Sequence, residues 1–245
     1  MINISAIILC KNASNSLERT LKSLEFCDEI ILADDGSTDN STEIAKKFGA
    51  KILHLPPGLG FAAKRNFAMQ HATHEWVLFV DSDEVVSDQL VQSIEKSIGS
   101  ELNGYLIRRT DIFMGRKLLH GEVGNVWILR LAKKSAGKWI RNVHEIWQIT
   151  GGIGKLDGAL QHYPHQTVSE FISDITMYAE LESKNRQQTQ VITFVQLILF
   201  PPAKFVHNYF LRLGFLDGVP GLIYAWAMSL HSLCVRIFIL EKYEA

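Results

Sequence analysis

The chain has 245 residues, of which 47% are hydrophobic and 21% charged, so it can bury a sizeable core and does not have the composition of a disordered protein. A formal net charge of −1 argues against general nucleic-acid binding, and no nucleic-acid partner is expected. The three cysteines, Cys10, Cys27 and Cys234, are odd in number and form no C-x-x-C pair, which fits a reduced, cytoplasmic compartment.

The first hundred residues alternate between apolar runs of strand length and helical patterns. Strands are predicted at 3–10, 29–34, 51–55 and 75–80, and helices at 14–26, 40–48, 60–72 and 87–98. Because this alternation is typical of βαβ units, the predicted fold class is α/β, with a mostly parallel sheet flanked by helices. The first apolar run has no basic lead and is interpreted as a strand, not a signal peptide.

Two of these strands end in acids. The second predicted strand runs into Asp34 and Asp35, and the fourth is followed by Asp81 and Asp83. Ligands of open α/β sheets bind at the carboxyl ends of the strands, so the pattern predicts a nucleotide laid across that edge. Asp-x-Asp also suits a hard divalent cation, Mg²⁺ or Mn²⁺, that holds substrate phosphates. Each motif alone also fits an ordinary turn or helix cap.

Three further residues are candidates for the same site. Leu9 and Asn12 border it at the end of the first predicted strand, where backbone contacts to a nucleotide base are expected. His162 is a candidate third metal ligand, and histidine binds Mn²⁺ more readily than Mg²⁺. The alternative for His162 is a half-buried histidine whose hydrogen bonds are satisfied within the protein.

The remaining chain changes character twice. Residues 104–165 are rich in glycine, aromatic residues and histidine, with short strands predicted at 104–110 and 125–131. They are assigned with the first part to one domain, residues 1–165. Residues 166–245 are predicted to form a helical, partly amphipathic C-terminal region.

Three apolar or helical runs make up this C-terminal region. They are predicted at 167–188, 191–200 and 222–240. The second is expected to end at Pro201 and Pro202, because proline removes a helical hydrogen bond. The third has about the 20-residue length that spans a bilayer, although its two polar residues favour an in-plane or packed helix.

An acid-free stretch, residues 183–216, carries basic and aromatic side chains together. Each basic residue near an anionic leaflet contributes about 1 kcal/mol, so this stretch predicts binding to an anionic membrane surface. The alternatives are that its aromatic residues pack on the catalytic domain or form a dimer contact.

Four segments, taken in order, resemble a known family. They are ISAIILCKN at 4–12, DDGSTD at 34–39, GFAAKRN at 60–66 and FVDSDE at 79–84. Together they resemble the inverting glycosyltransferases of family 2, which use nucleotide-sugar donors on a GT-A fold, and the resemblance covers roughly residues 1–165. Residues 142–164, from NVHE to LQHYP, resemble the small bacterial branch that includes the lipopolysaccharide inner-core β-1,4-glucosyltransferases.

The resemblance implies roles at the donor site. Asp83 would bind the metal, and Asp81 would lie near the ribose or the metal. Asp35, at the position of the family's nucleotide-contact acid, would contact the uridine. Arg65 would pair with a donor phosphate or contact the base, and its alternative is a solvated position on a helix.

The resemblance also implies a catalytic base. Glu145 lies where this branch carries the carboxylate that takes the acceptor proton. The alternative is a surface ion pair of Glu145 with Arg141 or Lys138, and Asp157 is the second candidate base. His144 is interpreted as an acceptor contact or a structural hydrogen-bonding residue.

The implied enzyme moves a sugar, such as glucose, from a nucleotide-diphospho-sugar to a lipid-linked glycan such as lipopolysaccharide core. It would work in the cytoplasm, peripherally bound at the inner face of a bacterial membrane. The same chemistry on a polyprenyl phosphate, capsular glycan or exopolysaccharide is one alternative. An inactive sugar-nucleotide-binding scaffold is another, which the intact Asp81, Asp83 and Glu145 disfavour.

Overall fold

A computed structural model describes residues 2–141, 145–164, 167–185 and 190–244. The chain divides into two compact units, the first formed by Met1–Arg109 and Val126–His162 and the second by Thr110–Asn125 and Tyr163–Ala245. The segment Thr110–Asn125 thus groups with the C-terminal helices. The boundary at residue 165 stays a prediction.

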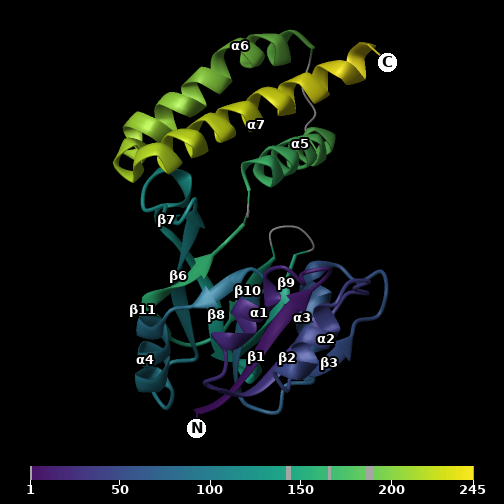
Figure 1. The fold of residues 1–245 in the computed structure, drawn as a ribbon, viewed down its shortest axis with the longest axis vertical. Coiled ribbons are helices and arrows are strands. Elements are labelled where there is room, and N and C mark those ends of the chain that lie inside the picture. The colour runs from purple at the N-terminus through teal and green to yellow at the C-terminus, as the bar shows by residue number, and fades with distance from the viewer. Residues whose placement is uncertain (1, 142–144, 165–166, 186–189, 245) are drawn as a thin grey trace. The chain divides into compact units, whose positions relative to one another are not determined.

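The first hundred residues form the alternating elements that the sequence predicts (Figure 1). The strands are β1 (Ile2–Cys10), β2 (Cys27–Asp34), β3 (Lys51–His54) and β4 (Trp76–Asp81). The helices are α1 (Leu17–Lys22), α2 (Ser41–Lys47), α3 (Phe61–Gln70) and α4 (Asp88–Ser97). The strands pair in parallel in the order β3-β2-β1-β4, so their carboxyl ends meet at one edge of the sheet.

The sheet continues past β4 in the order β8-β6-β11-β5. These strands are β5 (Glu84–Val86), β6 (Gly104–Phe113), β8 (Val126–Lys133) and β11 (Ile153–His162). The pairs β4–β8, β8–β6 and β11–β5 are antiparallel, so the sheet is mixed, with a parallel half and an antiparallel half. A separate two-stranded sheet is formed by β9 (Gly137–Ile140) and β10 (Ile146–Ile149), and a short 3₁₀ turn, η2 (Lys134–Ala136), precedes it.

Strand β4 is buried on both faces, which explains why its sequence is continuously apolar and not alternating. Leu78 and Val80 face one cluster, which includes residues of α1 and α4. Val77 and Phe79 face the other, where Phe79 meets the rings of Trp139 and Trp147 edge-on at 5.1 Å each. Burying such a side chain contributes about 1.5–3 kcal/mol, so this strand holds the acid-bearing edge firmly in place.

The second unit is mainly helical. It contains β7 (Arg116–Lys117), η1 (Gly121–Val123), α5 (Val168–Asn185), α6 (Gln190–Val206), the π-helical turn η3 (His207–Leu211), η4 (Gly214–Asp217) and α7 (Gly218–Glu244). Its core joins Phe113 and Leu118 of the β6–β7 hairpin to Phe171 and Ile175 of α5 and to α7. Among the described residues, one helix, residues 214–243, is long and apolar enough to cross a bilayer by length and composition alone.

Helix α6 does not end at its two prolines, as the sequence predicts, but runs through Pro201 and Pro202 to Val206. Each proline removes one hydrogen bond to the preceding turn. The hydroxyl of Ser229 on α7 donates to the carbonyl oxygen of Pro201 at 2.7 Å. Packing against α7 therefore maintains a helix that local sequence rules would end.

Candidate active site

The parallel register brings the predicted nucleotide-contact residues to one edge. Leu9 lies opposite Asp81, and Cys10 lies opposite Asp34. Asn12 follows with a left-handed backbone, φ 52°, and its side-chain oxygen accepts the N–H of Thr38 at 2.8 Å. This bond ties the loop after β1 to the loop after β2, so both line the same edge.

The two acids that end β2 have different surroundings. Asp34 is buried, and its carboxylate accepts the N–H of Ser37 at 3.0 Å, which organises the turn. The Asp35 side chain is 25% exposed and lies 2.6 Å from Nζ of Lys64. Asp35 is therefore the acid of the pair that a ligand can reach.

Asp81 lies between two arginines. Its Oδ1 is 3.0 Å from Nη2 of Arg65, and its Oδ2 is 2.6 Å from Nη2 of Arg130. Burial raises the pKa of Asp81, but the charges of Arg130 and Arg65 outweigh this and hold the pKa well below its ordinary value. Asp81 is therefore a carboxylate at neutral pH, with both oxygens engaged.

Arg65 connects this acid to Glu145. The Arg65 side chain is only 5% exposed, so the solvated helix position is wrong, and its guanidinium lies 4.6 Å from the Trp139 ring. Its Nε donates to Oε1 of Glu145 at 3.3 Å. The cation beside Glu145 is thus Arg65 of α3 and not Arg141 or Lys138.

Asp83 and His162 meet through strand pairing. In the β5–β11 register His162 lies opposite Glu84, which places its Nε2 3.3 Å from Oδ2 of Asp83. His162 is buried, while the Asp83 side chain is 34% exposed. A nitrogen of Arg109 lies 2.7 Å from the imidazole. Arg109 therefore holds the imidazole of His162 next to Asp83.

Asp83 and His162 fit a metal of the Mg²⁺ or Mn²⁺ type that is shared with a substrate. Throughout the described residues, no group of three or more His, Cys, Asp or Glu side chains is close enough to hold a metal alone. Such ions commonly use one or two carboxylates and take further oxygens from phosphate and water. Asp81 stays a predicted ligand, but a metal there would have to displace an arginine.

Glu84 is a buried carboxylate that contacts the turn carrying Asp81 and Asp83. It is fully buried, and its Oε2 accepts the backbone N–H of Asp81 at 3.0 Å. Its Oε1 lies 3.4 Å from Nε of Arg109. Burial, followed by the charge of Asp81, raises the pKa of Glu84. Glu84 therefore fixes the turn that carries Asp81 and Asp83.

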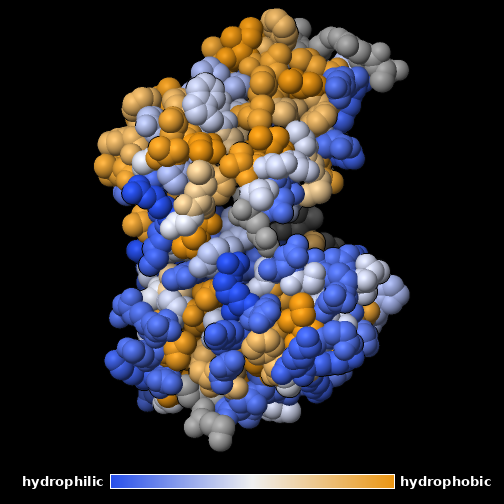
Figure 2. Space-filling view, viewed as in Figure 1, coloured by the Kyte–Doolittle hydropathy of each residue, from blue (hydrophilic) through white to orange (hydrophobic). Residues whose placement is uncertain are grey.

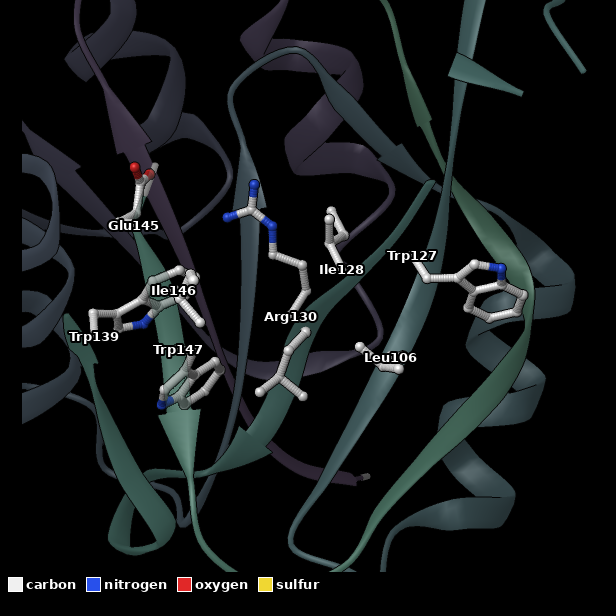
Figure 3. A pocket seen from close by; sticks show the side chains of 9 residues that line it. Leu106, Trp127, Ile128, Arg130, Trp139, Glu145, Ile146 and Trp147 are labelled. Carbon is white, nitrogen blue, oxygen red and sulfur yellow. The ribbon is translucent and has the colours of Figure 1, made fainter. Parts of the chain in front are cut away.

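A pocket of about 310 Å³ opens beside Glu145 (Figure 3). It is lined by Leu106, Trp127, Ile128, Leu129, Arg130, Trp139, Glu145, Ile146 and Trp147. Asp157, the second candidate base, is exposed on β11 and is not among these residues. His144 lies outside the described residues.

Sequence reasoning missed Arg130 and Arg109. Arg130 carries a signal that could have found it, because it is a charged residue inside the apolar strand Val126–Lys133, and arginine is rarely buried unless it is paired. Arg109 has no such signal, because its contacts depend on the β6–β11–β5 pairing.

The protein-family model "Glycosyl transferase family 2" matches residues 5–146. The lipopolysaccharide core biosynthesis glycosyltransferase LpsC of Rhizobium meliloti is 26% identical over 240 residues, which cover 91% of this chain and 89% of LpsC. An uncharacterized glycosyltransferase of Rickettsia prowazekii is 27% identical over 257 residues, with coverage of 96% and 87%.

Two solved structures are also similar. Staphylococcus aureus TarS matches with a TM-score of 0.48 and 17% identity, over 99% of this chain and 91% of that chain. Glucosyl-3-phosphoglycerate synthase of Mycobacterium tuberculosis, in complex with Mn²⁺, uridine diphosphate and glucosyl-3-phosphoglycerate, matches with a TM-score of 0.37 and 20% identity, over 46% and 45%.

Proposed function

This chain belongs to glycosyl transferase family 2, and on that premise we propose that it transfers a sugar from a nucleotide-diphospho-sugar to a glycan acceptor with inversion at the anomeric carbon. The observation that carries the proposal is the Arg65 bridge between Asp81 and Glu145. It joins a residue of the proposed donor site to the proposed base, although 64 positions separate them in the sequence, from 81 to 145.

The donor would lie across the carboxyl ends of β1, β2 and β4. Asp35 is assigned to the uridine and Asp81 to the ribose, since carboxylates accept hydroxyl and N–H hydrogens. Leu9 and Asn12 flank the base from the end of β1. Nη1 of Arg65 and Nη1 of Arg130 are buried and lack a hydrogen-bond partner in the described part of the chain, and such donors suit phosphate oxygens.

Asp83 and His162 are assigned to the metal, Mg²⁺ or Mn²⁺. When bound there, the metal would neutralise charge on the departing nucleoside diphosphate. The protein's own part is to hold the two ligands 3.3 Å apart, with Arg109 fixing His162 and Glu84 fixing the Asp81–Asp83 turn. The exposed part of the Asp83 carboxylate can then face the substrate.

Glu145 is assigned as the general base. It borders the pocket, and its side chain is 21% exposed, so an acceptor hydroxyl can reach it. Its carboxylate would accept the hydroxyl proton as the acceptor oxygen bonds to the anomeric carbon, opposite the leaving diphosphate. Arg65 holds Glu145 on one side, which fixes the direction of approach.

We propose a lipid-linked glycan acceptor, such as lipopolysaccharide core, and a peripheral position on the cytoplasmic face of the membrane. The similarity to LpsC supports the acceptor class. Exposed apolar side chains gather over α6, η3, η4 and α7 (Figure 2), among them Phe194, Ile198, Phe210, Leu211, Leu216 and Trp226. Large exposed apolar patches of this kind mark interaction surfaces.

The test is a screen of nucleotide sugars with Mg²⁺ or Mn²⁺, reading thermal stability. A ligand that binds only the folded state raises its melting temperature. We expect one uridine-diphospho-sugar to raise it in the presence of metal and to be turned over slowly to uridine diphosphate. If no nucleotide sugar shifts the melting temperature with either metal, the proposed donor site is wrong.

A further inference from the structure

Two cations flank a tryptophan at the edge of the pocket. Trp127 on β8 lies opposite Arg108 on β6, and the Arg108 guanidinium carbon is 5.4 Å from the ring centroid. Nζ of Lys155, on the neighbouring strand β11, is 4.7 Å from the same ring. Three adjacent strands therefore present an aromatic ring and two positive charges together.

These two cations differ from the arginines around the proposed donor and metal site. Arg65, Arg109 and Arg130 each lie within ion-pair distance of a carboxylate. Within the described ranges, neither Arg108 nor Lys155 has a carboxylate at ion-pair distance. Their positive charge is therefore matched by no group in this part of the protein.

The pocket connects this cationic end to Glu145. Trp127 and Glu145 lie on opposite sides of it in Figure 3, with Ile128, Arg130 and Leu106 between them. Its volume of about 310 Å³ is at the lower end of small-molecule sites. The pocket thus has the Glu145 carboxylate at one side and Trp127, with its two neighbouring cations, at the other.

We propose, resting on the function proposed above, that the acceptor glycan carries an anionic substituent, a phosphate or a carboxylate. That substituent binds Arg108 and Lys155, and the adjoining sugar lies against Trp127 and the apolar side chains of the pocket. The reacting hydroxyl then lies at Glu145. A neutral acceptor leaves both cations unmatched, so these two residues determine acceptor specificity and leave donor binding unaffected.

The test measures binding by ligand-observed NMR with the full chain, uridine diphosphate and Mg²⁺. The probes are glucose, glucose 6-phosphate, glucuronate and inorganic phosphate. We expect at least one anionic sugar to bind about tenfold more tightly than glucose, because hydrogen bonds to charged groups are the stronger kind. The preference should shrink with added salt, since both cations are accessible to solvent.

The double variant Arg108→Gln with Lys155→Gln should bind the anionic sugars and glucose equally. The matched control, Lys47→Gln with Lys96→Gln, removes two exposed lysines of α2 and α4 and should keep the preference. Equal binding of all sugars by the unmodified protein overturns the inference, and so does inorganic phosphate binding as tightly as glucose 6-phosphate. Uridine diphosphate binding, followed in the same samples, reports on the proposed function separately, because its failure alone counts against the donor site.

Discussion

The two halves of the sheet contribute to the site in different ways. The parallel half, β3-β2-β1-β4, presents acids where its strands end, with Asp34 and Asp35 at the end of β2 and Asp81 at the end of β4. The antiparallel half, β8-β6-β11-β5, contributes Arg130 beside Asp81 and His162 beside Asp83, and its Arg109 pairs with Glu84 of β5. The parallel half thus supplies the carboxylates of the proposed donor and metal site, while the antiparallel half helps to fix their charge and position.

The largest effect is expected when Asp83, the acid that lies beside His162, is removed. Asp83→Ala should lower turnover at least about 10³-fold, because the charge stabilisation at the leaving diphosphate is lost. The fold should survive, since the Asp83 side chain is 34% exposed. The measurement is sugar transfer with Mg²⁺ and Mn²⁺, with circular dichroism as the control. Near-normal turnover by this variant would remove Asp83 from the metal site.

The second change removes a partner from the antiparallel half. Arg130→Gln should lower the free energy of unfolding by about 3 kcal/mol. The substitution removes one of the two arginines that balance the charge of the Asp81 carboxylate, so that only Arg65 remains. Arg108→Gln on the neighbouring strand should change it by less than about 0.5 kcal/mol, because Arg108 is only half-buried and has no carboxylate at ion-pair distance among the described residues. Chemical denaturation measures both, and equal effects would contradict the distinction between the two arginines.

Arg130→Gln should also change how the stability of the protein depends on pH. The pKa of Asp81 is depressed in the folded state, so the stabilisation from its arginines is complete above the unfolded pKa of about 4 and is lost as the pH falls through the folded pKa. Arg130→Gln brings the folded pKa nearer to the unfolded one. The acid-dependent part of the stability should therefore shrink in the variant, as unfolding curves between about pH 3 and pH 6 would show. An unchanged pH dependence would mean that Arg65 alone sets the pKa.

The third change tests the residue that Arg65 holds. Glu145→Gln keeps the shape and removes the basicity, so turnover should fall about 10²-fold or more while donor binding is nearly unchanged. Asp157→Asn, on exposed β11, is the matched control and should remain near normal. Titration with uridine diphosphate measures the binding. A parallel loss of donor affinity would make Glu145 a binding residue instead.

The smallest expected effect concerns the helical unit. The sequence predicts membrane-surface binding from the acid-free stretch 183–216, whose lysines and arginines are Lys184, Arg186, Lys204 and Arg212. Arg186 lies outside the described residues, whereas Lys184 pairs with Glu180 and Lys204 pairs with Glu122. Arg212 is exposed and, in the part of the chain that is described, has no carboxylate partner.

We therefore expect the exposed apolar residues to contribute most to vesicle binding. Phe210→Ser with Leu211→Ser should weaken flotation with anionic liposomes about tenfold or more, and Arg212→Gln about fivefold. Val168→Ser on α5, also an exposed apolar position, is the control. Absence of flotation by the unmodified chain at low salt would leave these helices as a packing or dimer element.

Much of the fold could be predicted from the sequence. The α/β class, the family and its GT-A fold are confirmed. They were accessible because β1, β2 and β4 are local apolar runs with acids at their ends, and because helices of regular period lie between them. The antiparallel partner of β4, by contrast, is β8, about fifty positions further along the chain, and no local pattern specifies such a partner.

In the candidate site, too, residues with a local sequence signal differ from residues that only strand pairing brings together. Asp35, Asp81 and Asp83 could be proposed from the sequence because each lies at or next to a strand end, and their roles stay predictions. The ion pairs of Arg130 and Arg109 could not, because they arise from strand pairing across the sheet. The path of α6 through Pro201 was missed for a similar reason, since its support comes from Ser229 on another helix.

The hairpin at Thr110–Asn125 has a practical consequence for anyone who shortens this protein. Phe113 and Leu118 are buried against Phe171, Ile175 and Ala227, which lie beyond residue 165. Cutting the chain there removes those partners but leaves the hairpin behind, with two large apolar side chains exposed to water. A soluble catalytic fragment therefore requires two operations, removal of the tail and replacement of the hairpin between β6 and β8 by a short polar turn.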